Sequence, residues 1–409
     1  MKKLLEVFLG VLTAIGGFVD IGELVANTEA GARYGLALIW PVLLGLVVVL
    51  LYAEMAGRIA TLSERPVFDL VRERLGERAA LINLIGSVAV NFLTMTAEIA
   101  GVALSIQLAT DVSYFLWIPL VAFGVWMIIW KVKFSILENV FGILGLTLFA
   151  FAVAVWQMHP DWHSLFSQAT HPTVPHGEGH PTYLYWAIAV FGGTIMPYEL
   201  FFFSSGAVEE RWTRKDLFIN RANVYLGFPL GAAAAISIMT AAALVLKPAN
   251  IQVNHLDQAA LPVGLALGKV GLAVVLVGFF AATFGASLET ALSNGYVISQ
   301  FFGWSWGKLV SPREAPLFHA VMLVTIILAA GLGLSTIDPI KITEYSIVFS
   351  AVALPLTYVP VLIIANDPNY MGDKTNSRMT NALGMISLVV VVVAATAAIP
   401  LMIATKAGA

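Results

Sequence analysis

Two short stretches decide the fold of this 409-residue chain: residues 15–24, IGGFVDIGEL, and residues 191–200, FGGTIMPYEL. Each contains Gly-Gly, then five residues, then Glu-Leu. Each also lies inside an apolar run of about 20 residues or more, the length that a helix needs to cross a bilayer. Because glycine and proline weaken a helix, both stretches predict a membrane-spanning helix that is interrupted near its middle.

The composition agrees with a membrane protein. Hydrophobic residues make up 59% of the chain, charged residues only 11%, and the mean hydropathy is +0.86. An average soluble domain is about 45–50% apolar and about 25% charged. These values exclude a soluble enzyme and a disordered protein. The net charge of −3 gives no indication of nucleic-acid binding, and the absence of cysteine excludes disulfides and thiolate metal sites.

Apolar windows predict eleven membrane-spanning helices, and the protein is expected to be an all-α, multi-pass membrane protein. The predicted spans are residues 4–31, 36–60, 79–109, 114–131, 136–158, 183–208, 218–246, 263–298, 316–335, 338–364 and 380–405. The basic segment 61–78 predicts a short helix between the second and third spans.

The connections between the spans differ in charge. Only five basic residues fall on one side, namely Arg33, Lys247, Lys269, Lys341 and Lys406. The remaining 17 of the 22 Lys and Arg residues fall on the other side. Basic connections face the cytoplasm, so we expect a cytoplasmic N-terminus and, with eleven spans, an extracytoplasmic C-terminus in the cell membrane.

The two Gly-Gly stretches lie in spans 1 and 6, five spans apart, so they cross the membrane in opposite directions. This arrangement is typical of inverted-repeat transporters, in which the substrate site lies between two broken helices near the midplane. We therefore expect four parts: a first repeat (1–158), an extracytoplasmic loop (159–182), a second repeat (183–364), and a loop with the eleventh span (365–409).

The residues in the two breaks suggest a cation as the substrate. Asp20 and Glu23 lie in the first break, and Met196, Tyr198 and Glu199 lie in the second. A carboxylate inside a membrane is costly unless it is paired, protonated or bound to a cation. Carboxylates, free backbone carbonyls and a thioether together favour a divalent cation. The alternative is that Glu23 or Glu199 only stabilises the start of the following half-helix.

These residues resemble the natural-resistance-associated macrophage protein (Nramp) family of divalent metal transporters. That family carries Asp-Pro-Gly-Asn in span 1 and Met-Pro-His in span 6, where this chain has Asp20-Ile21-Gly22-Glu23 and Met196-Pro197-Tyr198. The resemblance extends to Ala97-Glu98-Ile99-Ala100-Gly101 in span 3, and to Met371-Gly372-Asp373 with Asn376 after span 10.

The resemblance implies a LeuT-type fold: two inverted five-helix repeats and one extra helix, working by alternating access. It implies metal binding by Asp20, Glu23 and Met196, helped by backbone carbonyls near Gly17 and Gly193, with Glu98 kept on the substrate pathway. The metal ion is then the cargo and no cofactor is expected. The expected partners are this ion and the lipid bilayer, without nucleic acid or an obligate partner protein.

Departures from the family pattern bear on coupling and selectivity. Met95, Tyr198 and Phe203 stand where the family has titratable residues, and this argues against proton coupling. Ala353 stands at the position of a span 10 Gln. Glu23 replaces a neutral amide, which suits Mg²⁺ or Ca²⁺, whereas the Met196 sulfur favours Mn²⁺ or Fe²⁺.

Several further polar residues lie in or near the spans. Glu289, with Asn294, is either a second cation or proton site or a residue paired across a helix interface. Glu54, Glu138 and Glu344 are expected to be paired. The loop 159–182 holds five of the seven histidines, which either collect metal ions or belong to a polar loop without ligands.

Two other functions fit the sequence less well. The same fold can carry an amino acid or an amine, but Asp20 and Glu23 would repel a substrate carboxylate at the broken helices. An intramembrane enzyme is excluded because His255 and His319 lie in no HExxH motif, and no nucleophile elbow or phosphate loop is present.

Overall fold

The computed structural model describes residues 18–408 except for 133, 176–177 and 336, and this part of the chain consists of helices and connecting loops without a strand. The first half contains α2 (Ile21–Tyr34), η1 (Gly35–Leu38), α3 (Ile39–Ser63), α4 (Val67–Leu75), α5 (Glu77–Thr110), α6 (Tyr114–Lys131), α7 (Phe134–Gly145), η2 (Leu146–Phe149), α8 (Ala150–Gln157) and α9 (Trp162–Thr170).

The second half begins with two helices that follow one another closely, α10 (His180–Thr194) and α11 (Pro197–Glu209). They are followed by η3 (Arg214–Asp216), α12 (Leu217–Ala222), the π-helical turn η4 (Asn223–Gly227), α13 (Phe228–Val245), α14 (Leu256–Phe302), α15 (Pro316–Gly333), α16 (Pro339–Ala365), α17 (Pro368–Met371), η5 (Gly372–Lys374) and α18 (Arg378–Ala404).

Ten segments of the described chain are long and apolar enough to cross a membrane. The sequence predicted eleven spans. The difference arises in residues 21–63, where α2, η1 and α3 follow one another directly and form a single candidate. Gly35, with φ 66°, ends α2 there, so two helices meet at the position where the sequence placed the boundary between spans 1 and 2.

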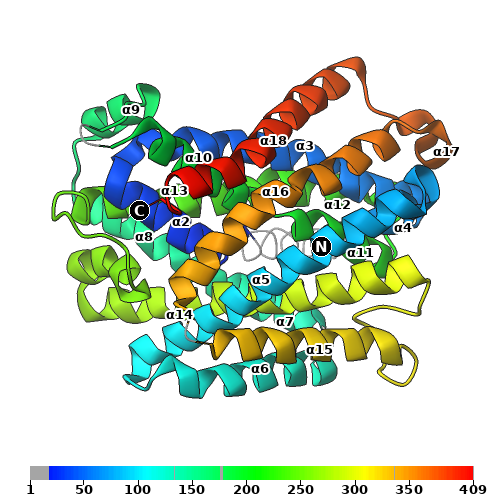
Figure 1. Ribbon diagram of the computed structural model, residues 1–409, viewed down its shortest axis with the longest axis horizontal. Helices are drawn as coiled ribbons and strands as arrows, with labels where there is room; N and C mark the ends of the chain where they lie inside the picture. The colour runs from blue at the N-terminus through cyan, green and yellow to red at the C-terminus, as the bar shows by residue number, and fades with distance from the viewer. Residues whose placement is uncertain (1–17, 133, 176–177, 336, 409) are drawn as a thin grey trace.

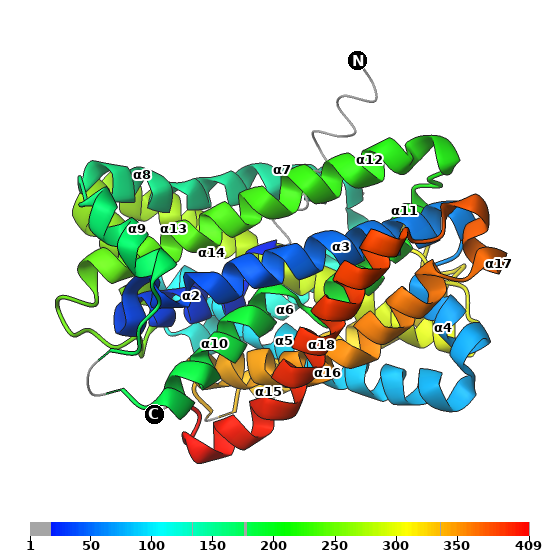
Figure 2. The ribbon, with the colours of Figure 1, turned by 90° about the horizontal axis from the view of Figure 1, so that it is seen from above.

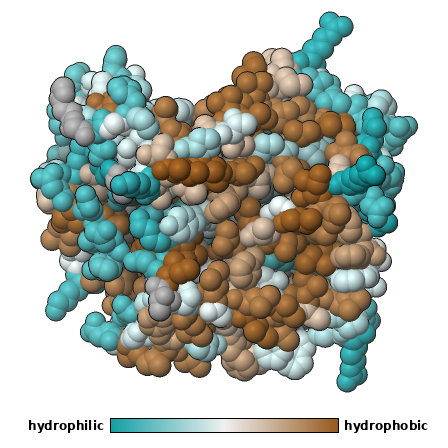
Figure 3. Space-filling model, viewed as in Figure 1, coloured by the Kyte–Doolittle hydropathy of each residue, from teal (hydrophilic) through white to brown (hydrophobic). Residues whose placement is uncertain are grey.

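The helices run roughly along the long axis of the molecule, which is horizontal in Figure 1. The end that carries α4 and α17 is called the α4 end, and the opposite end, with α9, is called the α9 end. Apolar surface gathers between the two ends in Figure 3, and hydrophilic surface gathers at both of them. This pattern is that of a protein whose central band faces lipid.

Contacts at the α4 end join segments that the distribution of basic residues assigns to the same side of the membrane. Arg74 pairs with Asp367 (2.6 Å), Arg58 donates to the Asn376 side chain (2.6 Å), and the Tyr370 hydroxyl donates to Glu73 (2.9 Å). Hydrogen bonds from Arg65 and Tyr370 hold the pKa of the Glu73 carboxyl below its usual range. The short helix predicted in 61–78 is α4.

The α9 end is held by residues from the smaller charge set. Arg33, in the last turn of α2, pairs with Glu178 (3.2 Å) and donates to the Gly408 carbonyl oxygen. One turn earlier, Glu29 accepts a hydrogen bond from the Val253 amide (3.1 Å). The last turn of α2 is thus connected to three separate segments of the chain.

The interior of the bundle is formed around α2, α10 and α11. Most residues of α10 and α11 are buried, whereas α6 and α18 leave most of their apolar residues on the surface. Figure 2 shows α2 and α10 on one side of the bundle, with α5 and α6 passing behind them. The two interrupted spans therefore lie where side chains are shielded from both lipid and water.

Candidate metal site

The first break precedes α2. Phe18 is helical, Val19 and Asp20 are not, and α2 begins at Ile21. Asp20 is the N-cap residue: its backbone is extended, and its Oδ1 accepts a hydrogen bond from the Glu23 amide (2.8 Å). Asp is among the residues that favour this position. The sequence therefore restarts the helix at the acidic pair Asp20 and Glu23.

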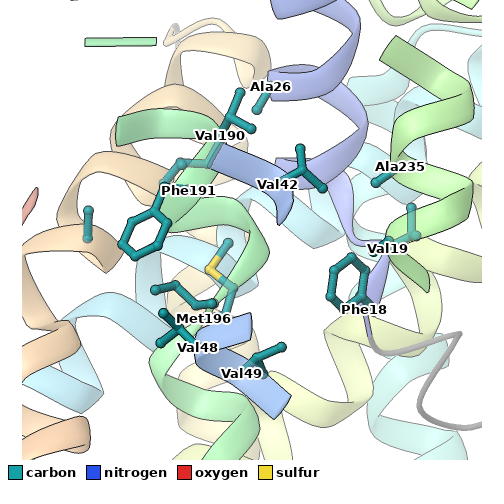
Figure 4. Packing of buried hydrophobic residues seen from close by; sticks show 14 of the residues in the cluster. Phe18, Val19, Ala26, Val42, Val48, Val49, Val190, Phe191, Met196 and Ala235 are labelled. Atoms are coloured by element: carbon teal, nitrogen blue, oxygen red, sulfur yellow. The ribbon is translucent and has the colours of Figure 1, made fainter. Parts of the chain in front are cut away.

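The second break separates α10 from α11. α10 ends at Thr194, Ile195 and Met196 have non-helical backbone angles, and α11 begins at Pro197. Proline suits the first position of a helix because its missing N–H would have no partner there. Met196 therefore stands just before a helix start, as Asp20 does in the first break. Figure 4 shows its sulfur in the packed interior.

Glycines lie where the two breaks meet. A Cβ placed on Gly22 would lie 3.0 Å from Asp20 Oδ1 and 3.1 Å from Met196 Cε, so a side chain there would crowd both residues. A Cβ placed on Gly193 would lie 3.8 Å from Glu23 Oε1, which is an ordinary contact and shows that Gly193 lies beside Glu23. The structure thus brings Asp20, Glu23, Met196 and Gly193 together, as the sequence predicted.

The carboxylates of this site are buried and incompletely hydrogen-bonded. Asp20, Glu23 and Met196 are each at most 1% exposed. Asp20 Oδ2 and Glu23 Oε1 accept no hydrogen bond from any described residue. Thr194 lies beside the Glu23 carboxyl, but its hydroxyl donates to the Val190 carbonyl oxygen (2.9 Å). Buried acceptors without donors are costly, and a divalent cation is the kind of ligand that would satisfy them.

Further acidic residues surround this pair. Glu98 of α5 is fully buried, and its Oε1 accepts a hydrogen bond from the Ile21 amide (3.2 Å), one of the free N–H groups at the start of α2. Glu98 Oε2 has no partner among the described residues. Glu98 thus holds the start of α2 and presents one free oxygen.

Tyr198 and Glu199 lie in the first turn of α11. Both are buried, and within the described structure the Tyr198 hydroxyl and Glu199 Oε2 lack hydrogen-bond partners. The carboxyls of Asp20 and Glu289 lie within electrostatic range of both residues; Glu289 is on α14 and is partly exposed. Tyr198 and Glu199 therefore lie around the breaks, at the start of α11.

Other candidates lie apart from the breaks. Glu54 pairs with Arg58 (3.1 Å) and Glu344 pairs with Lys341 (2.9 Å), which confirms the expected pairing of these two acids. Gly17, one of the expected carbonyl donors, lies outside the described residues, and so does the side chain of Glu138.

The histidine-rich loop gives no metal site within the described part of the chain, because no three His, Asp or Glu side chains come together there. Its two carboxylates have structural roles: Glu178 pairs with Arg33, and Asp161 accepts from the His163 amide at the start of α9 (3.0 Å). His176 lies outside the described residues.

Sequence reasoning missed Asn27, one helical turn after Glu23. Its Nδ2 donates to the Glu23 carbonyl oxygen (2.9 Å) and also to Glu23 Oε2. The signal was present, since residues four apart lie on the same face of a helix. A polar residue four positions after a candidate ligand marks this neighbour.

Residues 10–400 match the family model described as natural resistance-associated macrophage protein-like. Among curated relatives, a divalent metal cation transporter MntH from Erwinia tasmaniensis is 26% identical over 92% of this chain and 89% of its own length. A second MntH, from Deinococcus radiodurans, is 25% identical over 94% of this chain and 87% of its own length.

Solved structures share the fold. A manganese transporter from Eremococcus coleocola superposes with a TM-score of 0.76 at 18% identity, covering 96% of this chain and 85% of its own. A Na⁺-coupled sialic acid symporter reaches 0.61 at 10% identity, covering 95% and 89%. The all-helical LeuT-type fold expected from the sequence is thereby confirmed, and it is shared by proteins with different substrates.

Proposed function

Since this chain belongs to the natural resistance-associated macrophage protein-like family, we propose that it carries divalent metal cations of the Mn²⁺ and Fe²⁺ class across a membrane. The observation that supports this most directly is the pair of unpartnered, buried oxygens, Asp20 Oδ2 and Glu23 Oε1, in a break that faces Met196. Two carboxylate oxygens and a thioether suit a borderline divalent ion better than an organic substrate.

The proposed transport cycle is alternating access between two inverted repeats, residues 1–158 and 183–364, with residues 365–409 outside the repeats. Each repeat contributes one broken helix, and the cation binds between the two breaks. Glu98, Tyr198, Glu199 and Glu289 lie along the proposed pathway. The excess of basic residues at the α4 end supports a cytoplasmic N-terminus and an extracytoplasmic C-terminus in the cell membrane.

An organic substrate is the second candidate, because relatives in fold include a sialic acid symporter. In such transporters the starts of the broken helices bind an anionic substrate group. Here Asp20 occupies the start of α2 and Glu199 lies in the first turn of α11. These negative charges disfavour an anionic or zwitterionic substrate, so the cation is preferred.

The deciding experiment is Mn²⁺ entry into proteoliposomes loaded with a metal-quenched fluorophore, with external Mg²⁺ as competitor. The proposal expects saturable quenching that requires the protein. Folded, inserted protein without quenching would overturn it and favour the organic substrate. Strong competition by Mg²⁺ would indicate that the second carboxylate, Glu23, dominates selectivity.

Replacing Met196 with Ala tests whether the sulfur binds the ion. The expected result is a larger loss of Mn²⁺ uptake than of Mg²⁺ uptake, because a thioether is a soft ligand that contributes little to Mg²⁺. The measurement is the ratio of the two KM values in the same liposomes. Equal losses for the two ions would show that Met196 is not a ligand.

A further inference from the structure

The two carboxylates of the proposed site each have one oxygen engaged by the protein. Glu23 Oε2 accepts a hydrogen bond from Asn27 Nδ2, and Asp20 Oδ1 accepts one from the Glu23 amide (2.8 Å). The oxygens that remain, Glu23 Oε1 and Asp20 Oδ2, are the two without partners among the described residues. In each carboxylate, one oxygen is held by the protein and the other is free of protein hydrogen bonds.

The orientation of the Asn27 amide follows from its surroundings. Its nitrogen faces the Glu23 carbonyl oxygen and Glu23 Oε2, both of which are acceptors. The amide oxygen could not stand there, since it would meet two other oxygens without a proton between them. Asn27 is also 0% exposed. The Asn27 NH₂ group is thus a fixed donor.

We propose that Asn27 is a positioning residue that sets ion selectivity: by holding Glu23 Oε2, it restricts Glu23 to monodentate binding and so disfavours Ca²⁺ against Mn²⁺. This inference rests on the proposed function, because it concerns the ion bound at the same site. Ion selectivity would then depend on the hydrogen-bond partner of Glu23 as well as on the ligands themselves.

The physical basis is the difference in coordination between the two ions. Ca²⁺ takes about six to eight oxygen ligands at about 2.3–2.6 Å, often with both oxygens of one carboxylate. Mn²⁺ takes the same kinds of oxygen ligand, but in octahedral sites with about six ligands in all. Since the Met196 sulfur is a soft ligand, Ca²⁺ depends on oxygens, and the Asp20 and Glu23 carboxylates offer it one each. Releasing Glu23 Oε2 would supply one more.

The experiment measures the uptake of Ca²⁺ and of Mn²⁺ by the wild-type protein and four variants in proteoliposomes. Calorimetry in detergent gives the dissociation constants of both ions for the same proteins. Asn27→Ala removes the donor. Asn27→Ser also releases Oε2, because a serine hydroxyl in a helix bonds the carbonyl four residues before it, as the Thr28 hydroxyl does with Leu24 (2.6 Å). Asn27→Gln keeps an amide donor. Thr28→Val is the matched control, since it alters the neighbouring residue without touching Glu23.

The expected result is a Ca²⁺-to-Mn²⁺ ratio, in both uptake and affinity, that rises about 10- to 100-fold in Asn27→Ala and Asn27→Ser, the range seen when partners of metal ligands are removed. Asn27→Gln should restore much of the wild-type ratio, and Thr28→Val should not change it. The serine variant retains the helix hydrogen bond and so remains informative if the alanine variant fails to fold.

Two failures are distinguishable. If wild-type protein neither binds nor transports Mn²⁺, the proposed function fails and the inference falls with it. If wild-type protein transports Mn²⁺ but the Asn27 variants keep its Ca²⁺-to-Mn²⁺ ratio, only the inference is overturned. Equal losses of both ions in the alanine, serine and glutamine variants would likewise overturn it, because they would show a purely structural role.

Discussion

The two oxygens of the Asp20 carboxylate have different roles, one in capping α2 and one in the proposed cation binding. Oδ1 closes the start of α2 through the Glu23 amide, and Oδ2 faces the interior without a partner among the described residues. The first role needs only an acceptor, whereas binding a cation needs the negative charge. The two contributions can therefore be separated by substitution.

Asp20→Asn is expected to fold with nearly wild-type stability but to lose most Mn²⁺ uptake. Asparagine is an N-cap residue as effective as aspartate, so the helix start is kept while the charge is lost. Asp20→Ala should lose uptake and also about 1 kcal/mol of stability, the usual cost of removing a cap. Thermal melting in detergent and fluorescence quenching in liposomes give the two readouts.

A contrary result would be an Asp20→Asn protein that transports Mn²⁺ at the wild-type rate. It would show that the charge of Asp20 is dispensable and that the residue acts only as a cap. Ser377, the N-cap of α18, provides the control: Ser377→Ala should lower stability and leave uptake unchanged, because this residue lies far along the chain from both breaks.

At the scale of the element, α2 depends on close packing against α13. A Cβ on Gly31 would overlap the carbonyl oxygen of Met239 and would come within 2.9 Å of Ala242 Cβ. Backbone cannot move aside as a flexible side chain can. Gly31 therefore sets how closely the second half of the broken helix packs on its neighbour.

Gly31→Ala is expected to destabilise the protein by about 1–3 kcal/mol, the usual cost of overfilling a packed interface. Gly206→Ala is the control, since a Cβ on Gly206 in α11 meets nothing within 4 Å. There the substitution should be neutral or stabilising by about 0.5–1 kcal/mol, because glycine is a poor helix former. Thermal melting of both variants checks the contrast, and equal melting temperatures would contradict it.

How far the sequence predicts an element depends on whether its determinants are local. Span 114–131 was predicted with the bounds of α6, and the break in span 6 falls beside Pro197, because apolar length and proline act locally. The contact of Gly31 with Met239 has no local signal, since a glycine in a helix does not reveal which backbone approaches it.

In the candidate site too, some features have a local signal in the sequence and others depend on the three-dimensional structure. Asp20 and Glu23 could be predicted because carboxylates are rare inside apolar spans, and Met196 because it precedes Pro197 in the second break. The use of single carboxylate oxygens could not, because it depends on which oxygen of Glu23 the Asn27 amide meets. The role of Glu98 as an acceptor for the Ile21 amide needed the three-dimensional placement of α5.

At the scale of the whole molecule, the orientation in the membrane can be measured directly, because the chain contains no cysteine. In intact cells, a membrane-impermeant maleimide should label Ser164→Cys on α9 and should label Glu77→Cys, at the α4 end, only after permeabilisation. Both residues are exposed. The reverse labelling pattern would contradict the cytoplasmic assignment of the α4 end.

Mn²⁺ uptake is expected to proceed without acidification of the liposome interior. Met95 and Tyr198 are both buried, and neither a thioether nor a phenol exchanges protons readily near pH 7. A pH-sensitive dye inside the liposomes, read beside the metal-quenched fluorophore, makes the measurement. A proton flux that requires Mn²⁺ would contradict it.

The contacts of the last turn of α2 determine how this half-helix can move. Arg33 joins it to the loop before α10 and to the segment after α18, and Glu29 joins it to the segment before α14. A tilt of α2 must either carry these three segments with it or break its bonds to them. In the proposed transport cycle, opening on this face is therefore a collective event whose energy barrier is distributed over sequence positions far from the proposed metal site. Changes in these loops should alter the speed of transport without altering which ion is chosen.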